Sequence, residues 1–145
     1  IINKNINDID GFRTTSVFIA GAEHMPPEAA DVPRLMNELL FTSFKSDDFI
    51  YDLANFHIRY ERIHPFTDGN GRSGRVLINK LALQNGYAPF VIPKDKRTLY
   101  MNLLADCDIM GLKSMIEQLM NDEVYRMQQF GIDSEKASVK KIDSF

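Results

Sequence analysis

Apolar residues recur at spacings of three and four along most of the chain, which is the pattern of amphipathic α-helices. The spacing predicts helices over residues 32–40, 46–63, 70–86, 94–109 and 111–129. His64-Pro65 ends the second helix, because a residue before proline is pushed out of the helical region. Gly86 is expected to stop the third helix in a left-handed conformation. The sequence therefore predicts an all-α fold, a compact helical bundle.

The first part of the chain follows a different pattern. Residues 12–19 are rich in β-branched and aromatic side chains, and they lie between the turn signal Asp10-Gly11 and Gly21. Pro26-Pro27 then lacks the N–H groups that a strand needs for pairing. This segment predicts a small β-hairpin flap near the N-terminus, ahead of the helices.

Composition and charge narrow the class of protein. The chain has 145 residues, 44% of them hydrophobic, which suits one domain with a real core. Its 17 Lys and Arg against 20 Asp and Glu give a net charge of −3, which favours neither a nucleic-acid partner nor an anionic membrane. No apolar run approaches the ~20 residues that cross a bilayer, so we expect a cytoplasmic location and no membrane contact.

Three further residues bear on the class of protein and on whether the chain is part of a longer one. Cys107 is the single cysteine, which excludes an internal disulfide and a thiolate zinc site, and we expect it in the core. His57 lies on an apolar helix face and is expected to be a core histidine. The chain opens on Ile1 without a signal-peptide pattern, so we expect it to be part of a longer protein.

The segment from His64 to Arg75 carries the candidate chemistry. It reads His-Pro-Phe-Thr-Asp-Gly-Asn-Gly-Arg-Ser-Gly-Arg. The glycines allow successive N–H groups to face one concave side, and the helix that starts at Asn70 adds its unpaired N–H groups and positive dipole end. Arg72 and Arg75 are neighbours on the first helical turn, and guanidinium groups bind phosphate oxygens in pairs. These features predict a polyphosphate site.

Asp68 and His64 indicate what happens to the phosphate. A carboxylate repels phosphates unless a hard cation such as Mg²⁺ bridges the two. An imidazole with an ordinary pKa near ~6.5 can accept a proton from a hydroxyl group at neutral pH. A base, a metal ligand and an anion cradle in one loop predict transfer of a phosphorus group.

Other phosphate motifs fit less well. Residues 69–74 match G-x-G-x-x-G, and Asp95 lies about 20 residues further on, as in dinucleotide-binding folds. That motif follows a β-strand, whereas a helical pattern and His-Pro precede it here. The Walker pattern is absent, and so is a kinase-type catalytic loop.

His64 to Arg75 resembles the signature of the Fic family, H-P-F-x-[DE]-G-N-[GK]-R-x-x-R, without a mismatch. The likeness extends over roughly residues 8–120. Residues 10–27 look like the family's β-hairpin flap, residues 53–63 like the helix before the motif, and residues 97–100 like the helix that follows. The resemblance implies an N-terminally incomplete Fic domain over residues 1–130 and a polar tail over residues 131–145.

The resemblance implies transfer of AMP from ATP to a Ser, Thr or Tyr hydroxyl of a target protein. His64 would then be the base, and Asp68 would hold Mg²⁺ against the α- and β-phosphates. Arg72 would meet the β-phosphate and Arg75 the γ-phosphate. The implied phosphate-binding residues are Gly69, Asn70 (through its side chain as well), Gly71, Arg72, Gly74 and Arg75. A phosphotransferase branch has Lys at the position of Gly71, so glycine there favours adenylyl transfer.

The resemblance also implies two contact surfaces. The adenine pocket would be a helix face of residues four apart, namely Tyr100, Leu104 and Asp108. Many relatives have Asn where Asp108 aligns, and a carboxylate can likewise accept a bond from the adenine amino group. An extended segment of the target would pair by strand addition with the flap residues Val17, Phe18, Ile19 and Ala20.

Alternatives and regulation stay open at this point. The same site could remove AMP from a modified protein, act in both directions, or serve as a non-catalytic nucleotide-binding regulatory module, although His64 argues against the last. The family's inhibitory motif [ST]-x-x-x-E-[GN] is missing, since Ser114 to Glu117 is one residue too short. An inhibitory helix is expected from the missing N-terminal part or from a separate antitoxin protein, unless restraint is absent.

Overall fold

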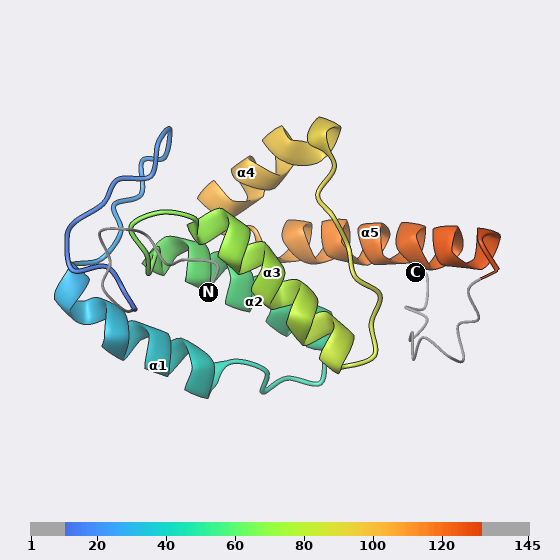
Figure 1. Ribbon diagram of the computed structural model, residues 1–145, viewed down its shortest axis with the longest axis horizontal. Helices are drawn as coiled ribbons and strands as arrows, with labels where there is room; N and C mark the ends of the chain where they lie inside the picture. The colour runs from blue at the N-terminus through green and yellow to red at the C-terminus, as the bar shows by residue number, and fades with distance from the viewer. Residues whose placement is uncertain (1–10, 132–145) are drawn as a thin grey trace.

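The computed structural model describes residues 11–131, which form a bundle of five α-helices with two short 3-10 helices (Figure 1). The α-helices are α1 (Val32–Thr42), α2 (Phe49–Ile63), α3 (Asn70–Gln84), α4 (Arg97–Ala105) and α5 (Ile109–Gln129). The 3-10 helices are η1 (Ala29–Asp31) and η2 (Lys94–Lys96). This confirms the predicted all-α class. The polar tail, apart from Gly131, lies outside the described residues, as does Asp10.

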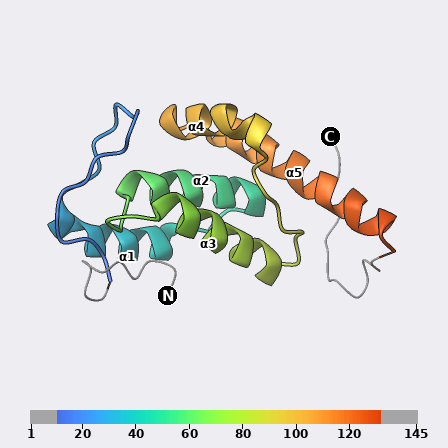
Figure 2. The ribbon, with the colours of Figure 1, turned by 45° about the horizontal axis from the view of Figure 1, so that its top comes forward.

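Helix α2 is the centre of the bundle. It packs against α1, α3 and α5, and Figures 1 and 2 show it running through the middle of the molecule. A helix with neighbours on several sides must be apolar around most of its surface. The buried side chains of α2 are Ile50, Asp52, Leu53, Ala54, Phe56, His57, Ile58, Tyr60 and Ile63. The prediction that His57 belongs to the core is confirmed, because it is 0% exposed.

The ends of α2 and α3 follow from local residues. Asp48 caps α2 by accepting a hydrogen bond of 2.9 Å from the Tyr51 N–H. Gly86 has φ 79°, which confirms the left-handed stop after α3. Helix α2 ends at Ile63 as predicted, but His64 takes a left-handed conformation with φ 49° and ψ 62°. Its N–H still donates to the Tyr60 carbonyl oxygen at 3.1 Å, so the helical hydrogen-bond pattern includes His64. This bond keeps His64 out of the extended conformation that is usual before a proline.

The predicted β-hairpin flap is wrong for the described residues, because residues 11–28 contain no strand. This N-terminal loop has two unpaired arms joined by a turn, visible at the left of Figure 1. In the turn the Ala22 N–H donates to the Ile19 carbonyl oxygen at 3.1 Å, and Gly21 has φ 76°. An isolated two-stranded ribbon is marginally stable, and here the arms form no backbone ladder within residues 11–28 but bond to the end of α2. His24 Nε2, for example, lies 3.0 Å from the Arg62 carbonyl oxygen.

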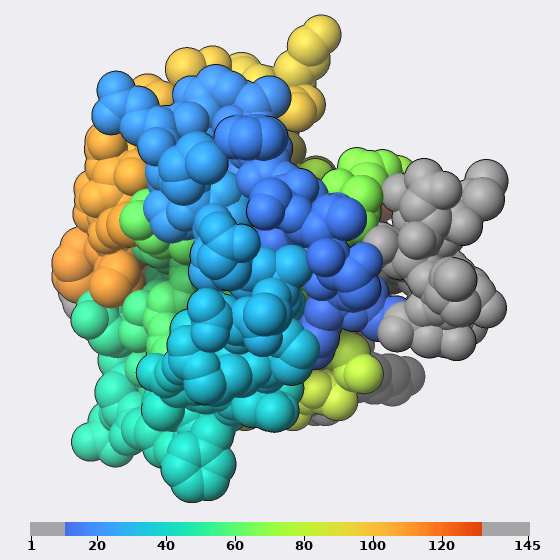
Figure 3. Space-filling view, turned by 90° about the vertical axis from the view of Figure 1, so that its left-hand side faces the viewer, coloured from blue at the N-terminus to red at the C-terminus, as the bar shows by residue number. Residues whose placement is uncertain are grey.

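Arg13 fastens the N-terminal loop to the bundle. It is 2% exposed, and its backbone N–H donates to the Pro65 carbonyl oxygen at 2.8 Å. Its guanidinium donates to four carbonyl oxygens, those of His64 (2.7 Å), Thr15 (3.0 Å), Ile63 (3.3 Å) and Pro27. One side chain therefore joins both arms of the loop to the end of α2, and Figure 3 shows the loop covering that end of the molecule.

The connection between α4 and α5 corrects one expectation. Cys107 is exposed and has φ 53°, so it lies in a left-handed turn and not in the core. This turn separates α4 from α5, so that α4 ends at Ala105, earlier than predicted, and α5 begins at Ile109, two residues before the predicted start. Within residues 11–131 the structure has no helix that is both long enough and apolar enough to cross a bilayer.

Replacing Arg13 tests its role in the fold. Arg13→Ala strands several carbonyl oxygens that a charged donor now satisfies, so we expect the free energy of unfolding to fall by about 3 kcal/mol. Arg34→Ala removes an exposed arginine whose ion pair with Asp31 spans 3.2 Å, and should cost less than about 1 kcal/mol. Urea denaturation of the two variants measures the difference, and equal losses would contradict the assignment.

Candidate active site

A pocket of about 500 Å³ lies where α2 ends, α3 and α4 begin and the N-terminal loop turns. Its volume is typical of small-molecule sites. The predicted site residues that line it are Phe18, Ile19, Ala20, His64, Asp68, Gly69, Asn70, Gly71, Arg72, Arg75, Tyr100 and Leu104. Val17, Gly74 and Asp108 are not among its lining residues. The fold thus brings most of the candidate residues to one place.

The N-terminus of α3 supplies an anion cradle. Gly69 precedes the helix with φ 76°, a left-handed conformation that glycine adopts without strain. The first helical bond runs from the Ser73 N–H to the Gly69 carbonyl oxygen at 2.9 Å. The N–H groups of residues 70–72 come before it and lack an acceptor within the helix. They lie in the wall of the pocket, where an anion can accept their hydrogen bonds.

Asn70 holds the loop in shape through its side chain. The amide Oδ1 accepts from the Phe66 N–H at 2.8 Å, and Nδ2 donates to the Phe66 carbonyl oxygen at 2.8 Å. The residue is 2% exposed. In the structure this side chain contacts the loop itself, and its contact with phosphate stays a prediction. Phe66 packs its ring against Phe12, with centroids 5.8 Å apart.

Gly74 serves helix packing, although the sequence placed it in the phosphate set. It is buried against α2, where an added Cβ would collide with Glu61 Oε1 and lie 3.1 Å from His57 Cε1. Its N–H also falls after the first helical bond of α3, so it is not one of the unpaired groups. Glycine is needed here because α2 and α3 approach closely.

Asp108 is separated from the other predicted adenine-pocket residues. Helix α4 ends at Ala105 and Cys107 is left-handed, so the four-residue spacing from Tyr100 and Leu104 does not reach position 108. Asp108 instead caps α5, where Oδ1 accepts from the Gly111 N–H at 2.8 Å. A short polar side chain before an apolar helical run is a helix-cap signal, and it accounts for Asp108.

His64 presents one ring nitrogen to the pocket. Nδ1 lies 3.2 Å from the Glu61 carbonyl oxygen, which can only accept, so Nδ1 carries the hydrogen. Nε2 is then the unprotonated nitrogen. Burial lowers the pKa of His64, and the charges of Arg13 and His24 lower it further, while the bond to the Glu61 carbonyl opposes them. The imidazole is therefore neutral at pH 7 and able to accept a proton.

The two arginines differ in surroundings. Arg72 is exposed and pairs with exposed Asp68, with 3.4 Å between Nη2 and Oδ2, an arrangement that a ligand can displace at little cost. Arg75 is half-buried and lies over Gly71, since a Cβ added at Gly71 would be 3.1 Å from Arg75 Nη1. The absence of a side chain at position 71 thus leaves room for the second guanidinium.

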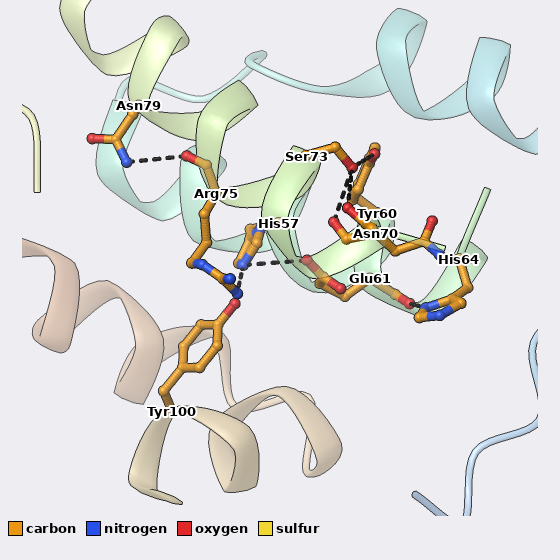
Figure 4. A network of polar contacts seen from close by, with 10 residues as sticks. His57, Tyr60, Glu61, His64, Asn70, Ser73, Arg75, Asn79 and Tyr100 are labelled. Carbon is orange, nitrogen blue, oxygen red and sulfur yellow. Dashed lines mark hydrogen bonds and ion pairs between the residues drawn. The ribbon is translucent and has the colours of Figure 1, made fainter. Parts of the chain in front are cut away.

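Behind Arg75 lies a buried polar cluster (Figure 4). His57 Nε2 is 2.7 Å from the Tyr100 hydroxyl oxygen and 3.8 Å from Glu61 Oε1. Burial and the charge of Arg75 lower the pKa of His57 to about 3, so this histidine is neutral. Burial raises the pKa of Tyr100 to about 12, and its hydroxyl is also a hydrogen-bond partner of Arg75. The cluster therefore holds one permanent positive charge, that of Arg75.

The sequence reasoning did not assign Glu61 or Arg97 to the site, yet both line the pocket. Glu61 could have been noticed, because a carboxylate four residues after His57 interrupts the apolar face of α2. Arg97 begins α4 within a run of charged residues. Such a run is equally typical of a solvent-exposed helix start, so the sequence gives no sign that Arg97 belongs to the site.

A separate groove of about 900 Å³ runs along α3 and residues 90–92 and shares Arg72 and Arg75, but it lacks His64 and Asp68.

The residues at the pocket also fit a single divalent cation shared with phosphate. Asp68 is the exposed carboxylate at the cradle, and Mg²⁺ in proteins commonly takes one or two carboxylates together with phosphate oxygens and water. Among residues 11–131 no three His, Cys, Asp or Glu side chains gather at one point. A cation here would therefore draw most of its ligands from the substrate and solvent.

Comparisons with known proteins agree with this geometry. A family model described as "Fic/DOC family" matches residues 1–82, which include the whole loop from His64 to Arg75. The curated "Protein adenylyltransferase Fic" of Drosophila grimshawi is 38% identical over 106 residues, covering 69% of this chain and 22% of that protein. The protein of the same name from Drosophila erecta is 36% identical over 108 residues, covering 69% and 21%. The chain thus spans roughly a fifth of the length of these relatives.

A solved structure extends the likeness beyond the motif. The crystal structure of a Fic domain containing signaling protein from Bacteroides thetaiotaomicron superposes with a TM-score of 0.65 at 25% sequence identity. The match covers 92% of this chain and 56% of that protein chain. The arrangement of helices around the pocket is therefore shared well past the twelve-residue signature.

The chain offers a matched test of the Asn70 contact. Asn79 makes the same pair of bonds to Phe90, with Nδ2 to the carbonyl oxygen at 3.0 Å and Oδ1 from the N–H at 2.8 Å. Asn70→Ala and Asn79→Ala should each lower the free energy of unfolding by about 1–3 kcal/mol. Only Asn70→Ala should weaken binding of a nucleoside triphosphate, by about tenfold or more, equivalent to about 1.4 kcal/mol. Calorimetric titration of both variants with the nucleotide measures this difference. Equal affinities of the two variants would contradict the role of Asn70 in shaping the phosphate-binding loop.

Proposed function

Because this chain belongs to the Fic/DOC family, we propose that it transfers AMP from ATP to a hydroxyl group of a target protein. The observation that carries the proposal is that His64 and the start of α3 line the same pocket. An imidazole with an unprotonated Nε2 lines the same pocket as unpaired helix N–H groups and two arginines. That arrangement offers a base to the acceptor hydroxyl and an electrostatic cradle to the phosphates.

His64 would act as the general base. The hydrogen on Nδ1 is held by the Glu61 carbonyl, so Nε2 accepts the proton of a Ser, Thr or Tyr hydroxyl as its oxygen attacks the α-phosphorus. Pyrophosphate leaves, and the new bond joins the target oxygen to the phosphorus of AMP. A module that only binds nucleotide gains nothing from an imidazole positioned in this way, which argues against the non-catalytic alternative.

The start of α3 would hold the triphosphate. The N–H groups of residues 70–72 donate to phosphate oxygens, Arg72 meets the β-phosphate and Arg75 the γ-phosphate. Gly71 supports adenylyl transfer over phosphotransfer on steric grounds, because a longer residue there would displace the Arg75 guanidinium.

Asp68 would hold the metal ion. Mg²⁺ held by this carboxylate would neutralise part of the negative charge of the α- and β-phosphates. For this, Asp68 must exchange its contact with Arg72 for the cation, which frees the Arg72 guanidinium for phosphate.

The remaining pocket walls suit the other two parts of the reaction. Tyr100 and Leu104 line the pocket on α4 and would contact the adenine ring. The turn of the N-terminal loop would dock the target, with Phe18, which directly precedes this turn, 76% exposed. Strand addition would use the backbone of Val17, Phe18, Ile19 and Ala20, which lies in no strand of its own, although the Ile19 carbonyl oxygen already accepts from the Ala22 N–H.

Restraint of this activity would come from outside the described residues. Glu117, the glutamate nearest to the family's inhibitory pattern, lies on α5 and pairs with Lys113 at 3.5 Å, next to Asp48 at the other end of α2. It is therefore not positioned to meet Arg75. We propose that an inhibitory helix is supplied by a preceding segment or an antitoxin protein, that the enzyme is cytoplasmic, and that its domain ends near residue 130, after α5.

Labelled ATP tests the reaction class. We expect label from the α-phosphate, and none from the γ-phosphate, to appear on protein when the chain is incubated with Mg²⁺, ATP and a protein extract. His64→Asn should reduce this transfer by about 10²–10⁴-fold, the usual contribution of a general base. Asparagine is the chosen substitution because it tolerates the left-handed backbone of position 64, so the loop is preserved. Transfer from the γ-phosphate alone would replace the proposal with phosphorylation.

The acidity of His64 predicts the pH dependence of transfer. Burial holds the pKa of His64 below its ordinary value, so the base loses its free lone pair only when the pH falls below about 6.5. The rate should be level on the alkaline side of neutrality and fall on the acid side, with a midpoint below about 6.5. A midpoint above that value, in single-turnover rates measured at saturating ATP, would exclude His64 as the base in this environment.

A further inference from the structure

Glu61 is a buried carboxyl group that the proposed chemistry does not use. It lies on α2 with its side chain 13% exposed. Oε1 is inaccessible to solvent and has no hydrogen-bond partner among the described residues. Oε1 lies where a Cβ added at Gly74 of α3 would collide with it, and Glu61 lines the pocket. Figure 4 shows its carboxyl group beside His57. A buried carboxyl oxygen without a hydrogen-bond partner is costly, which calls for a reason for its presence.

The groups around Glu61 leave Arg75 as its principal charged neighbour. From α2 it faces His57 and Tyr60, and burial keeps both neutral by lowering the pKa of His57 to about 3 and raising that of Tyr60 to about 12. From α4 it faces neutral Tyr100, with Arg97 at the edge of the same pocket. On its other side, His24 and His64 share a small pocket with it. The charge of Arg75 opposes the effect of burial on the Glu61 carboxyl.

Arg75 can therefore interact electrostatically with two negative groups. One is the Glu61 carboxylate on the buried side, and the other is a terminal phosphate in the pocket. Burial raises the pKa of Glu61 to about 7, so near neutral pH the group exists in both protonation states. A phosphate on Arg75 would cancel the positive potential that supports the carboxylate, and the carboxyl group would then bind a proton more tightly.

We propose that Glu61 is a positioning residue of the terminal-phosphate subsite: it attracts the Arg75 guanidinium while no phosphate is bound and takes up a proton from solvent when phosphate binds to Arg75. The inference rests on the proposed function for the identity of the ligand. The proton adds to the carboxylate oxygen and no other bond changes. Glu61 thus sets the charge of the subsite without touching the substrate.

The sign of the effect follows from linkage. Because binding takes up a proton, the affinity for a triphosphate increases as the pH falls from about 8 to about 6, by at most tenfold per pH unit for one proton. ADP does not reach Arg75 in the proposed orientation, so its affinity should depend less on Glu61. Replacing Glu61 by glutamine mimics the protonated form and should remove this dependence.

Calorimetry of nucleotide binding tests the inference. A non-hydrolysable ATP analogue with Mg²⁺ is titrated at pH 7.5 in two buffers of different ionisation enthalpy, which yields the number of protons taken up. Glu61→Gln should take up fewer protons than the unmodified protein and bind the analogue more tightly at pH 8, by up to about tenfold. The matched control is Glu38→Gln on α1, an exposed glutamate that pairs with Arg34 at 3.5 Å and should behave like the unmodified protein.

The outcomes separate the two proposals. If the analogue binds and Glu61→Gln takes up as many protons as the unmodified protein, the role of Glu61 is excluded while the nucleotide site stands. If the unmodified protein binds no analogue, the proposed function itself is overturned. Carboxyl ¹³C NMR on the unmodified protein needs no variant: Glu61 should titrate near neutral pH when free and at higher pH with the analogue bound, and an unchanged titration would exclude the inference.

Discussion

The two hydrogen bonds between the Asn70 amide and the Phe66 backbone are the constraint on which the site depends. They close the loop between α2 and α3, and so fix how the end of one helix faces the start of the next. His64 ends α2 and the anion cradle starts α3, which means that the base and the phosphate site share one short, internally bonded connection. The same pair of bonds at Asn79 and Phe90 shows that an asparagine serves this chain twice as a substitute for regular backbone pairing.

A second feature of the molecule is the use of buried charge near the pocket. Arg13 is enclosed and bonded only to carbonyl oxygens, so it joins the N-terminal loop to the site without contributing a direct contact to the chemistry. Glu61 and Arg75 both line the pocket, and the charge of Arg75 opposes the rise that burial causes in the pKa of Glu61. Buried groups of this kind are expensive for stability, and their place beside the pocket agrees with the general tendency of perturbed groups to gather at functional sites.

Much of this arrangement was predictable from the sequence, for reasons that differ between elements. The spacing of apolar residues predicts the helices. The anion cradle is predicted by residues 64–75, because few structures other than a phosphate site combine glycines, arginines, an aspartate and a histidine in this way. The hairpin prediction failed because β-propensity in residues 12–19 cannot show that Arg13 and His24 bond to α2 instead. Asp108 was assigned to the adenine pocket because the helical periodicity was extended across a turn. Gly74 was assigned to the phosphate site because a glycine in the motif can serve either helix packing or phosphate binding. Arg13 acts through partners far away in sequence, which no local pattern reveals, whereas Glu61 interrupts the apolar face of α2 and could have been noticed.

The central claim is that a nucleoside triphosphate lies at the start of α3 facing His64. Amide-resolved NMR during a titration with ATP and Mg²⁺ tests it most directly, because each N–H reports on its own surroundings. We expect the largest shifts at residues 69–72, with a smaller change at His64. Shifts concentrated along the outer groove of α3, at residues 76–84 and 90–92, with the amides of residues 69–72 unchanged, would contradict it.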